Sequence, residues 1–455
     1  MIFITMHNSV PSALAPENWP FSWELLPQPA YMVGGAVRDA ILGRSRGYLD
    51  LDFVVPAGAV KLARAIASRY QAGFVLLDRQ RQIARVVFPH ATVDIAQQEG
   101  ASLETDLHRR DFTVNAIAYN PHTQEIIDPL QGLADLQQGR LRMVSAANLR
   151  DDPLRLMRAY RQAAQLDFTI EPTTQSTIRD LASHIISVAA ERVRVEIGYL
   201  LANSPGTLWI TKAWEDGLIT PLFPNATRES CNQLAAVDQA ACFLAKTSPL
   251  LGRQLQESVR NTIKTTWLGI AKLACLVHPQ LEIAETQLQK LTYSRAEIRS
   301  VSTALKLFPL FRKTDLTLRE QYFFFREVGI VFSATATLAL ARDKLVEATF
   351  GDEPDSLSSA LQNGCAVACG GESSSSAASP LDGYALLIGR YLNPDDLVAH
   401  PTPLVSGEEI IVALNIPASP VVGQLLGEIA IAQVEGKIST AAEAIAFARQ
   451  LKGEG

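Results

Sequence analysis

Two carboxylates stand two positions apart in the run LDLDFVV, residues 49–55. In a strand, side chains two apart lie on one face, so Asp50 and Asp52 point together while Leu51 and Phe53 point toward a core. Such a pair can bridge two Mg²⁺ ions about 4 Å apart, the arrangement of two-metal phosphoryl transfer. The alternative is a solvent-facing edge strand.

A third carboxylate, Asp94, lies between Val93 and Ile95 in the run ATVDIAQ. In a two-metal polymerase site such a group can help to deprotonate the attacking hydroxyl. Asp94 is the best candidate for that role by its pattern. A strand aspartate that simply faces solvent is the alternative.

A pair of glycines follows a short apolar run in YMVGGAVRDAILG, residues 31–43. Gly34 and Gly35 let the backbone approach a ligand closely, and the free N–H groups of the helix that follows attract phosphate. Arg38 would add a guanidinium to the same anion. An ordinary strand–turn–helix is the alternative.

A charged cluster opens the run HRRDFTVNAIAYN, residues 108–120. Arg109 and Arg110 could neutralise a triphosphate, and Asp111 could accept hydrogen bonds from a ribose hydroxyl. Asn115 lies where a buried amide would need partners. Alternatively, the cluster is a surface ion-pair network.

Two further acids, Asp151 and Asp152, precede Pro153 at the predicted start of a helix. Asp152 and Arg155 are three apart, which would put them on one helical face. A carboxylate accepts from the amino group of cytosine or adenine, and arginine donates to a ring acceptor. Uracil and guanine present a carbonyl instead, so protein side chains could replace a template base. The alternative is an intrahelical salt bridge.

These residues need elements to position them. Up to about residue 142 the sequence predicts a small α/β domain with a mixed sheet, and beyond 148 long helical patterns run to about 350. Interruptions are expected near residues 204–206 and 223–226, and residues 364–380 are serine-rich and low in complexity. The predicted strands are 31–33, 51–55, 74–77, 83–88 and 91–95, and the first long helix is 60–70.

The amino-acid composition limits the classes of protein to which the chain could belong. The 455 residues are 47% hydrophobic and 19% charged, which suits a soluble globular chain of two to four domains. No long uninterrupted apolar run predicts a membrane span, and the N-terminus does not resemble a signal peptide. Five cysteines without a CxxC pair argue against a zinc site or disulfides and favour the cytoplasm. The net charge of −6 disfavours a dedicated RNA-binding module more than an RNA-processing enzyme.

Taken in order, the motifs resemble those of tRNA nucleotidyltransferases. The matching segments are GGAVRD with DLD, RRDFTVNA, IIDPLQGLADL at 126–136, RDDPLRLMRAYRQAAQLDF at 150–168 and ISVAAERVRVEI at 186–197. They resemble most the bacterial branch shared by class II CCA-adding enzymes and poly(A) polymerases, within the polymerase-β-like superfamily. The resemblance covers residues 31 to about 200.

The resemblance implies an α+β fold in which a small mixed-sheet head precedes an extended all-helical neck, body and tail. The expected domains are an N-terminal extension 1–30, a catalytic head 31–145, a neck with the nucleotide-selecting motif 146–205, a body 206–360, a serine-rich linker 361–380 and a tRNA-binding tail 381–455. In the tail, Gly407 and Gly423 flank short helices that could bind phosphate or simply pack.

The resemblance also assigns roles. Metal ligation falls to Asp50 and Asp52, and two Mg²⁺ ions would act on CTP and/or ATP with tRNA as partner. Asp94 is the candidate for the third catalytic acid by its strand pattern. Asp151 departs from the glutamate common in the family. The implied nucleotide-binding residues are Gly34, Gly35, Arg38, Arg109, Arg110, Asp111, Asn115, Asp151, Asp152, Arg155 and Arg158.

The product stays open at this point. CCA-adding, CC-adding and A-adding enzymes and poly(A) polymerases share these motifs, and an inactive RNA-binding scaffold would keep the fold. The stretch between Asp52 and Arg109 is short compared with that of CCA-adding enzymes, which favours CC addition. Intact acids at Asp50 and Asp52 argue against the scaffold. The sequence does not indicate the oligomeric state.

Overall fold

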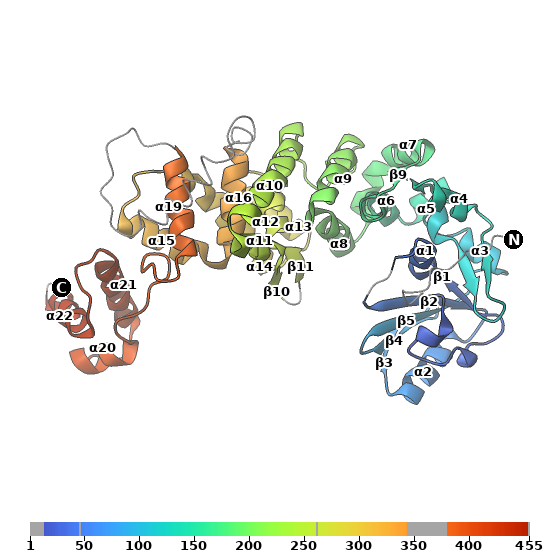
Figure 1. The fold of residues 1–455 in the computed structure, drawn as a ribbon, viewed down its shortest axis with the longest axis horizontal. Coiled ribbons are helices and arrows are strands. Elements are labelled where there is room, and N and C mark those ends of the chain that lie inside the picture. The colour runs from blue at the N-terminus through green and yellow to red at the C-terminus, as the bar shows by residue number, and fades with distance from the viewer. Residues whose placement is uncertain (1–12, 45–46, 261–262, 344–379, 454–455) are drawn as a thin grey trace. The chain divides into compact units, whose positions relative to one another are not determined.

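The computed structural model describes residues 13–44, 47–260, 263–343 and 380–453 (Figure 1). These residues form two compact units, which we call unit 1 and unit 2. Unit 1 is Met1–Glu196 with Lys212–Leu222, and unit 2 is Ile197–Thr211 with Phe223–Gly455. The predicted serine-rich linker falls, up to residue 379, outside the described residues.

Unit 1 is built on a seven-stranded sheet with the order β3-β4-β5-β2-β1-β6-β7. β2 and β5 run parallel, and every other neighbouring pair is antiparallel. The five predicted strands are confirmed, whereas β6 and β7 are too short to show an alternating pattern. The strands are β1 Tyr31–Val33, β2 Leu49–Val55, β3 Gly73–Asp78, β4 Ile83–Phe88, β5 Ala91–Gln97, β6 Ala118–Asn120 and β7 Glu125–Ile127.

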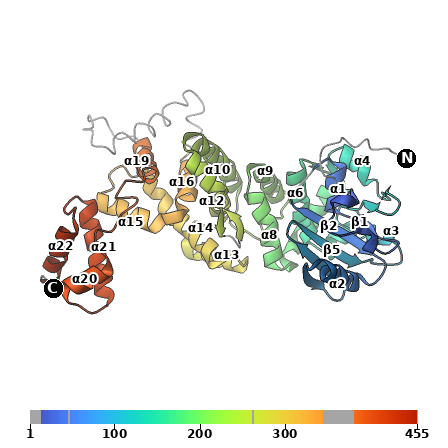
Figure 2. The same cartoon turned by 60° about the horizontal axis from the view of Figure 1, so that its bottom comes forward.

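Helices cover this sheet and extend beyond it. α2 lies along the sheet beside β4 and β5 (Figures 1 and 2), with Ala63 and Ile66 buried between them. The helices of unit 1 are α1 Gly35–Ile41, α2 Ala59–Tyr70, α3 Leu103–Leu107, α4 Gly132–Gln137, α5 Ala146–Asp151, α6 Leu154–Leu166 and α7 Pro172–Leu181. A short parallel pair, β8 Arg140–Leu141 with β9 Thr169–Ile170, joins α4 to α6 and α7.

The segment before β1 belongs to the core of unit 1. The Trp19 and Phe21 rings lie 4.9 and 5.8 Å from the Phe53 ring, edge to face. Trp19 Nε1 also donates to the Ala13 carbonyl at 2.7 Å. Part of the predicted N-terminal extension therefore stabilises the strand that carries the two aspartates.

Unit 2 is predominantly helical. α8 and α9 contribute residues to both units, and α10, α12 and α16 pack together at the centre of unit 2. An antiparallel hairpin of β10 and β11 corrects the expectation of a purely helical body. Its elements are α8 Ala190–Leu201, α9 Ser204–Glu215, α10 Arg228–Thr247, α11 Pro249–Gln256, β10 Ser258–Arg260, β11 Ile263–Thr266, α12 Trp267–Leu276, α13 Leu281–Lys290, α14 Arg295–Leu307, α15 Leu318–Val328, α16 Phe332–Arg342, α19 Pro380–Leu392, α20 Gly407–Leu414, α21 Pro420–Val434 and α22 Ala441–Gly453.

One long apolar stretch, Leu318–Arg342, spans α15 and α16 and has the length and composition of a membrane helix. Its apolar window is 72% buried inside the protein. Core helices of soluble proteins pass the same test, so this stretch is weak evidence for a membrane span.

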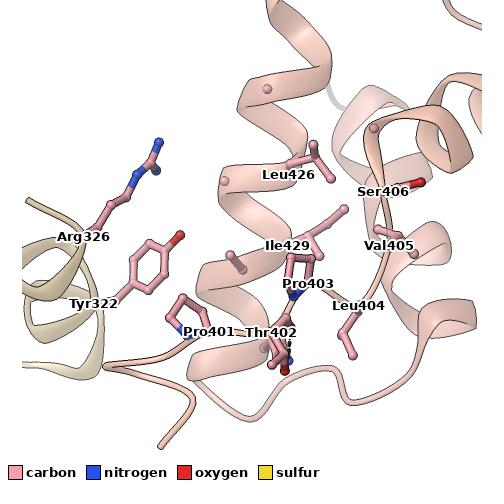
Figure 3. Close-up of a pocket in the computed structure, with 15 residues that line it drawn as sticks. Tyr322, Arg326, Pro401, Thr402, Pro403, Leu404, Val405, Ser406, Leu426 and Ile429 are labelled. Carbon is pink, nitrogen blue, oxygen red and sulfur yellow. Dashed lines mark hydrogen bonds between the residues drawn. The ribbon is translucent and has the colours of Figure 1, made fainter. Parts of the chain in front are cut away.

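The tail helices α20, α21 and α22 share an apolar core of their own. A pocket of about 450 Å³ lies between α15 and this tail, with Tyr322 and Arg326 on one wall and Pro401 and Leu426 on the other (Figure 3). A Cβ at Gly407 would make ordinary contacts with Val422 and Leu426 of α21, so the first residue of α20 lies close against α21. The pocket is lined by Gly407 and Gly423 but by none of the residues predicted for catalysis or nucleotide binding.

Candidate active site

The aspartates of β2 lie on one face of the sheet, as predicted. Leu51 and Phe53 are buried on the opposite face. Asp52 stands in register with Asp94 of the parallel neighbour β5, so their side chains emerge side by side. Asp50 accepts a 2.6 Å hydrogen bond from the Thr92 hydroxyl of the same neighbour. Three carboxylates therefore converge on one patch.

The carboxylates of this patch repel one another, which raises the pKa of Asp52 further than burial alone. Burial raises the pKa of Asp52 to about 7, and the charges of Asp94 and Asp50 add to the effect. Among the described residues, no group of three His, Cys, Asp or Glu side chains could hold a metal alone. Mg²⁺ is commonly held by one or two carboxylates together with substrate phosphates, and a cation would relieve the repulsion. Asp50 and Asp52 fit such a site.

The Asp94 carboxylate forms an ion pair that the sequence did not indicate. Arg85 of β4 stands opposite it and donates to both of its oxygens, at 2.7 and 2.8 Å. This bidentate pair occupies acceptor positions that a catalytic base would use. The prediction that Asp94 takes a proton stays untested, and the geometry favours a supporting electrostatic role beside Asp52.

The glycine turn closes over the carboxylates. Gly34 has a φ of +75°, and a Cβ placed on it would lie 3.3 Å from Asp52 Oδ2 and 3.4 Å from Arg110 Nη1. Gly35 then begins α1. The turn thus brings a bare stretch of backbone, a carboxylate and a guanidinium together, which suits a triphosphate.

Of the two neighbouring arginines, only Arg110 is placed at this turn. Its Nη2 donates to Asp106 at 3.2 Å, and its Nε has no partner among the described residues. Arg109 points instead to Glu99, at 3.0 Å, and its side chain is 61% exposed. Arg110 is therefore the better candidate for the triphosphate.

Arg38 and Asn115 belong to a buried polar network. Arg38 Nη1 donates to Asn115 Oδ1 at 2.6 Å, and its Nε and Nη2 donate to Asp39. The Asn115 amide donates in turn to Asp111 and to Gln162 of α6, both at 2.9 Å. Arg38 is 8% exposed. These bonds connect α1, the segment after α3, and α6, so Arg38 fits a positioning role as well as the predicted phosphate contact.

Asp111 is the centre of that network. It accepts from the Phe112 N–H, from Asn115 and Gln162, and from Arg158 at 2.8 Å. Burial alone would raise the pKa of Asp111, but the Arg158 charge and these hydrogen bonds lower it to about 2. A carboxylate with about four acceptor positions has few left for a ribose. The ribose contact stays a prediction, and Asp111 and Arg158 together fix α6.

The nucleotide-selecting motif, residues 151–155, does not form the continuous helix that the sequence predicts. α5 ends at Asp151, which is exposed, and Asp152 is extended, with φ −132° and ψ 91°, before α6 begins at Leu154. Asp152 and Arg155 therefore do not share a helical face. The cause is Pro153, since the residue before a proline is disfavoured in the helical conformation.

The two side chains of the motif have separate partners. Arg192 of α8 approaches both Asp152 oxygens, at 3.4 and 3.1 Å. Arg155 Nη1 donates to the Arg109 carbonyl at 2.8 Å, and burial lowers the pKa of Arg155. The structure does not form the alternative of a salt bridge between Asp152 and Arg155, because Asp152 pairs with Arg192 of α8 instead.

Sequence analysis missed three residues of the site: Arg85, Gln162 and Arg192. Arg85 could have been found by pairing the 83–88 and 91–95 strands as a hairpin, which sets it opposite Asp94. Gln162 lies one helical turn after Arg158. Arg192 lies in the 186–197 segment that resembles a family motif, but no local signal indicated its contact with Asp152, which is 40 positions away.

Two family models match this chain. The Poly A polymerase head domain matches residues 30–142, and the probable RNA and SrmB-binding site of polymerase A matches residues 167–229. The first covers the sheet, the glycine turn and the part of the charge network that precedes α6, whereas Arg158 and Gln162 lie beyond it. The second begins just after α6.

Relatives match nearly the whole chain. A CC-adding tRNA nucleotidyltransferase of Synechocystis sp. is 47% identical over 95% of this chain and 96% of its own length. An A-adding tRNA nucleotidyltransferase of Deinococcus radiodurans is 30% identical over 93% and 96%. The structure of a Thermotoga maritima CCA-adding enzyme complexed with tRNA has the same fold, with a TM-score of 0.61 at 21% identity over 93% of this chain and 91% of that one. The chain therefore belongs to the tRNA nucleotidyltransferase and poly(A) polymerase family, and it is a nucleotidyltransferase.

Proposed function

We propose that this nucleotidyltransferase adds two C residues, and no terminal A, to the 3′ end of tRNA. The observation that carries the proposal is the end-to-end 47% identity to the CC-adding enzyme of Synechocystis, set against 30% to the A-adding enzyme. The short stretch from Asp52 to Arg109 agrees with it, because α2, β3, β4, β5 and α3 occupy most of it. CTP is then the substrate, and the cytoplasm is the expected compartment.

The carboxylate patch supports a mechanism with divalent metal. Asp50 and Asp52 would hold two Mg²⁺ ions, which when bound neutralise the triphosphate and favour ionisation of the tRNA 3′-hydroxyl. Gly34 leaves room for the phosphates against the backbone, and Arg110 supplies positive charge beside them. Arg85 keeps Asp94 paired, so that the negative charge around Asp52 stays moderate.

Base choice would rest on Asp152 and Arg155. The Asp152 carboxylate accepts from the exocyclic amino group of cytosine, and Arg155 donates to a ring acceptor. The Arg38–Asn115–Asp111–Arg158 network fixes the start of α6 on which Arg155 lies. Uracil would bring a carbonyl against the carboxylate and be rejected.

The test is a nucleotide-addition assay on three tRNA transcripts that end before CCA, after the first C and after CC. Each transcript meets the enzyme with Mg²⁺ and CTP, ATP or both. We expect the first to gain two C residues, the second one and the third none, even with ATP present. A complete CCA end would overturn the CC-adding proposal, and long A tails would show a poly(A) polymerase.

A further inference from the structure

We propose that Arg192 is a specificity-determining positioning residue, which holds the Asp152 carboxylate in the orientation that accepts cytosine. This inference rests on the proposed base-reading role of Asp152. The observation behind it is the contact of Arg192 Nη1 with Asp152 Oδ1 at 3.4 Å and of Nη2 with Oδ2 at 3.1 Å.

The Asp152 backbone is fixed locally, whereas its side chain depends on Arg192. Its N–H donates to the Asn148 carbonyl, and its carbonyl accepts from the Arg155 N–H at 3.0 Å. On the side chain, only Oδ1 has a local bond, from the Leu154 N–H at 3.3 Å. Arg192 supplies the contacts that fix the direction of Oδ2.

The Asp152 carboxylate has few acceptor positions left for a base. A carboxylate offers about four, two on each oxygen. The Leu154 N–H and the first Arg192 nitrogen occupy Oδ1, and the second Arg192 nitrogen takes one position on Oδ2. About one position on Oδ2 remains for the amino group of cytosine. Since arginine only donates, it leaves both oxygens as acceptors, which is what rejects uracil.

The place of Arg192 in α8 supports this role over one in helix stability. It lies in the first turn of α8, where the positive end of the helix dipole disfavours a cation. Its side chain is 52% exposed and that of Asp152 is 33% exposed, so the pair is accessible to a nucleotide. Both distances exceed the 2.7–2.9 Å of tight charge-assisted bonds, which leaves the carboxylate able to engage a base.

The test compares the kcat/KM of CTP with that of UTP in single-nucleotide addition to a tRNA lacking CCA. For Arg192→Ala we expect the preference for CTP to fall about tenfold, the value of one hydrogen bond to a charged group. Arg192→Lys keeps a positive charge and a donor but loses the planar pair of N–H groups, so it should retain part of the preference for CTP. Arg69→Ala, an exposed arginine in the last turn of α2, is the matched control and should leave the preference unchanged.

Asp152→Ala separates this inference from the proposal on which it rests. We expect it to abolish the preference for CTP, and Asp152→Ala/Arg192→Ala to be no worse. If Arg192→Ala lowered CTP and UTP addition equally while Asp152→Ala abolished the preference, Arg192 would be merely structural and the inference would be wrong. If Asp152→Ala kept the preference, the base-reading role itself would be overturned, and this inference with it.

Discussion

The two units bury polar groups in different ways. In unit 1, buried charges bridge elements that are distant in the chain, as in Arg38 with Asn115 and Asp111 with Arg158. In unit 2, the buried hydroxyls of Ser300, Thr335 and Thr337 bond within their own helices, as Thr337 does to the Ser333 carbonyl at 2.7 Å. A helix satisfies such a hydroxyl locally, whereas a buried charge needs a partner brought by the fold. The long-range network of unit 1 therefore marks where the fold holds chemistry in place.

The largest effect should come from the carboxylate patch. Asp50→Ala removes a proposed metal ligand, and we expect nucleotide addition to fall at least about a thousandfold, since metal stabilisation of the transferring phosphate is worth several kcal/mol. RNA binding, measured by gel shift, should change little. The control is Asp180→Ala, an exposed aspartate of α7. Retained activity in Asp50→Ala would disprove the two-metal assignment.

The buried polar network of unit 1 should make the free energy of unfolding depend on pH. The pKa of Asp111 is lowered from 3.8 to about 2, so its pairing contributes roughly 2 kcal/mol above pH 4, and the contribution disappears as pH falls from 4 to 2. Arg158→Leu leaves the carboxylate buried without its charge partner and should cost about 3 kcal/mol at pH 7.

Urea denaturation of wild type and Arg158→Leu at several pH values measures this difference. It should shrink as the pH falls from 4 toward 2, because the wild type also buries a protonated Asp111 once the pH is below its pKa of about 2. A difference that stays constant down to pH 2 would show that the Arg158 charge is not its source.

A buried ion pair of unit 2 tests the comparison between the two units. Lys272 is fully buried, lies 2.8 Å from Asp238 and donates to the Asn203 carbonyl at 2.8 Å. Lys272→Met should cost about 2 kcal/mol of unfolding free energy, because Asp238 loses its charge partner. The double variant Lys272→Met/Asp238→Leu should recover much of the lost unfolding free energy, since a well-packed apolar pair can replace a buried ion pair. The preference for CTP over UTP should not change in either variant, and a change would contradict the separation of the two units' roles.

The smallest effect belongs to the hydroxyls within helices. Thr337→Val removes a bond to the carbonyl one turn earlier, and we expect a change within about 1 kcal/mol in thermal unfolding. Thr113 of unit 1 offers the contrast, because its hydroxyl bonds the buried Asp135 at 2.6 Å. Thr113→Val should cost more than Thr337→Val. An equal cost would undermine the distinction between local and long-range polar bonds.

The sequence predicted what depends on near neighbours. Short apolar runs rich in β-branched and aromatic residues located the strands, and the spacing of Asp50 and Asp52 placed both on one face. Partners that arise from pairing of distant segments were not predictable, as Arg192 shows, whereas Arg85 follows once its strand is paired with that of Asp94 as a hairpin. The helical face expected for Asp152 and Arg155 was wrong because Pro153 was taken as part of the first turn, whereas it forces the residue before it to be extended.

The central claim is that Asp50 and Asp52 hold the metal ions that carry the CTP triphosphate. Mn²⁺ binding followed by electron paramagnetic resonance, with CTP present and tRNA absent, tests it most directly. The wild type should bind about two Mn²⁺ ions per chain, and Asp50→Asn and Asp52→Asn should lose this binding, while Asp180→Asn keeps it. Undiminished Mn²⁺ binding in both β2 variants would show that the metal is held elsewhere and would contradict the claim.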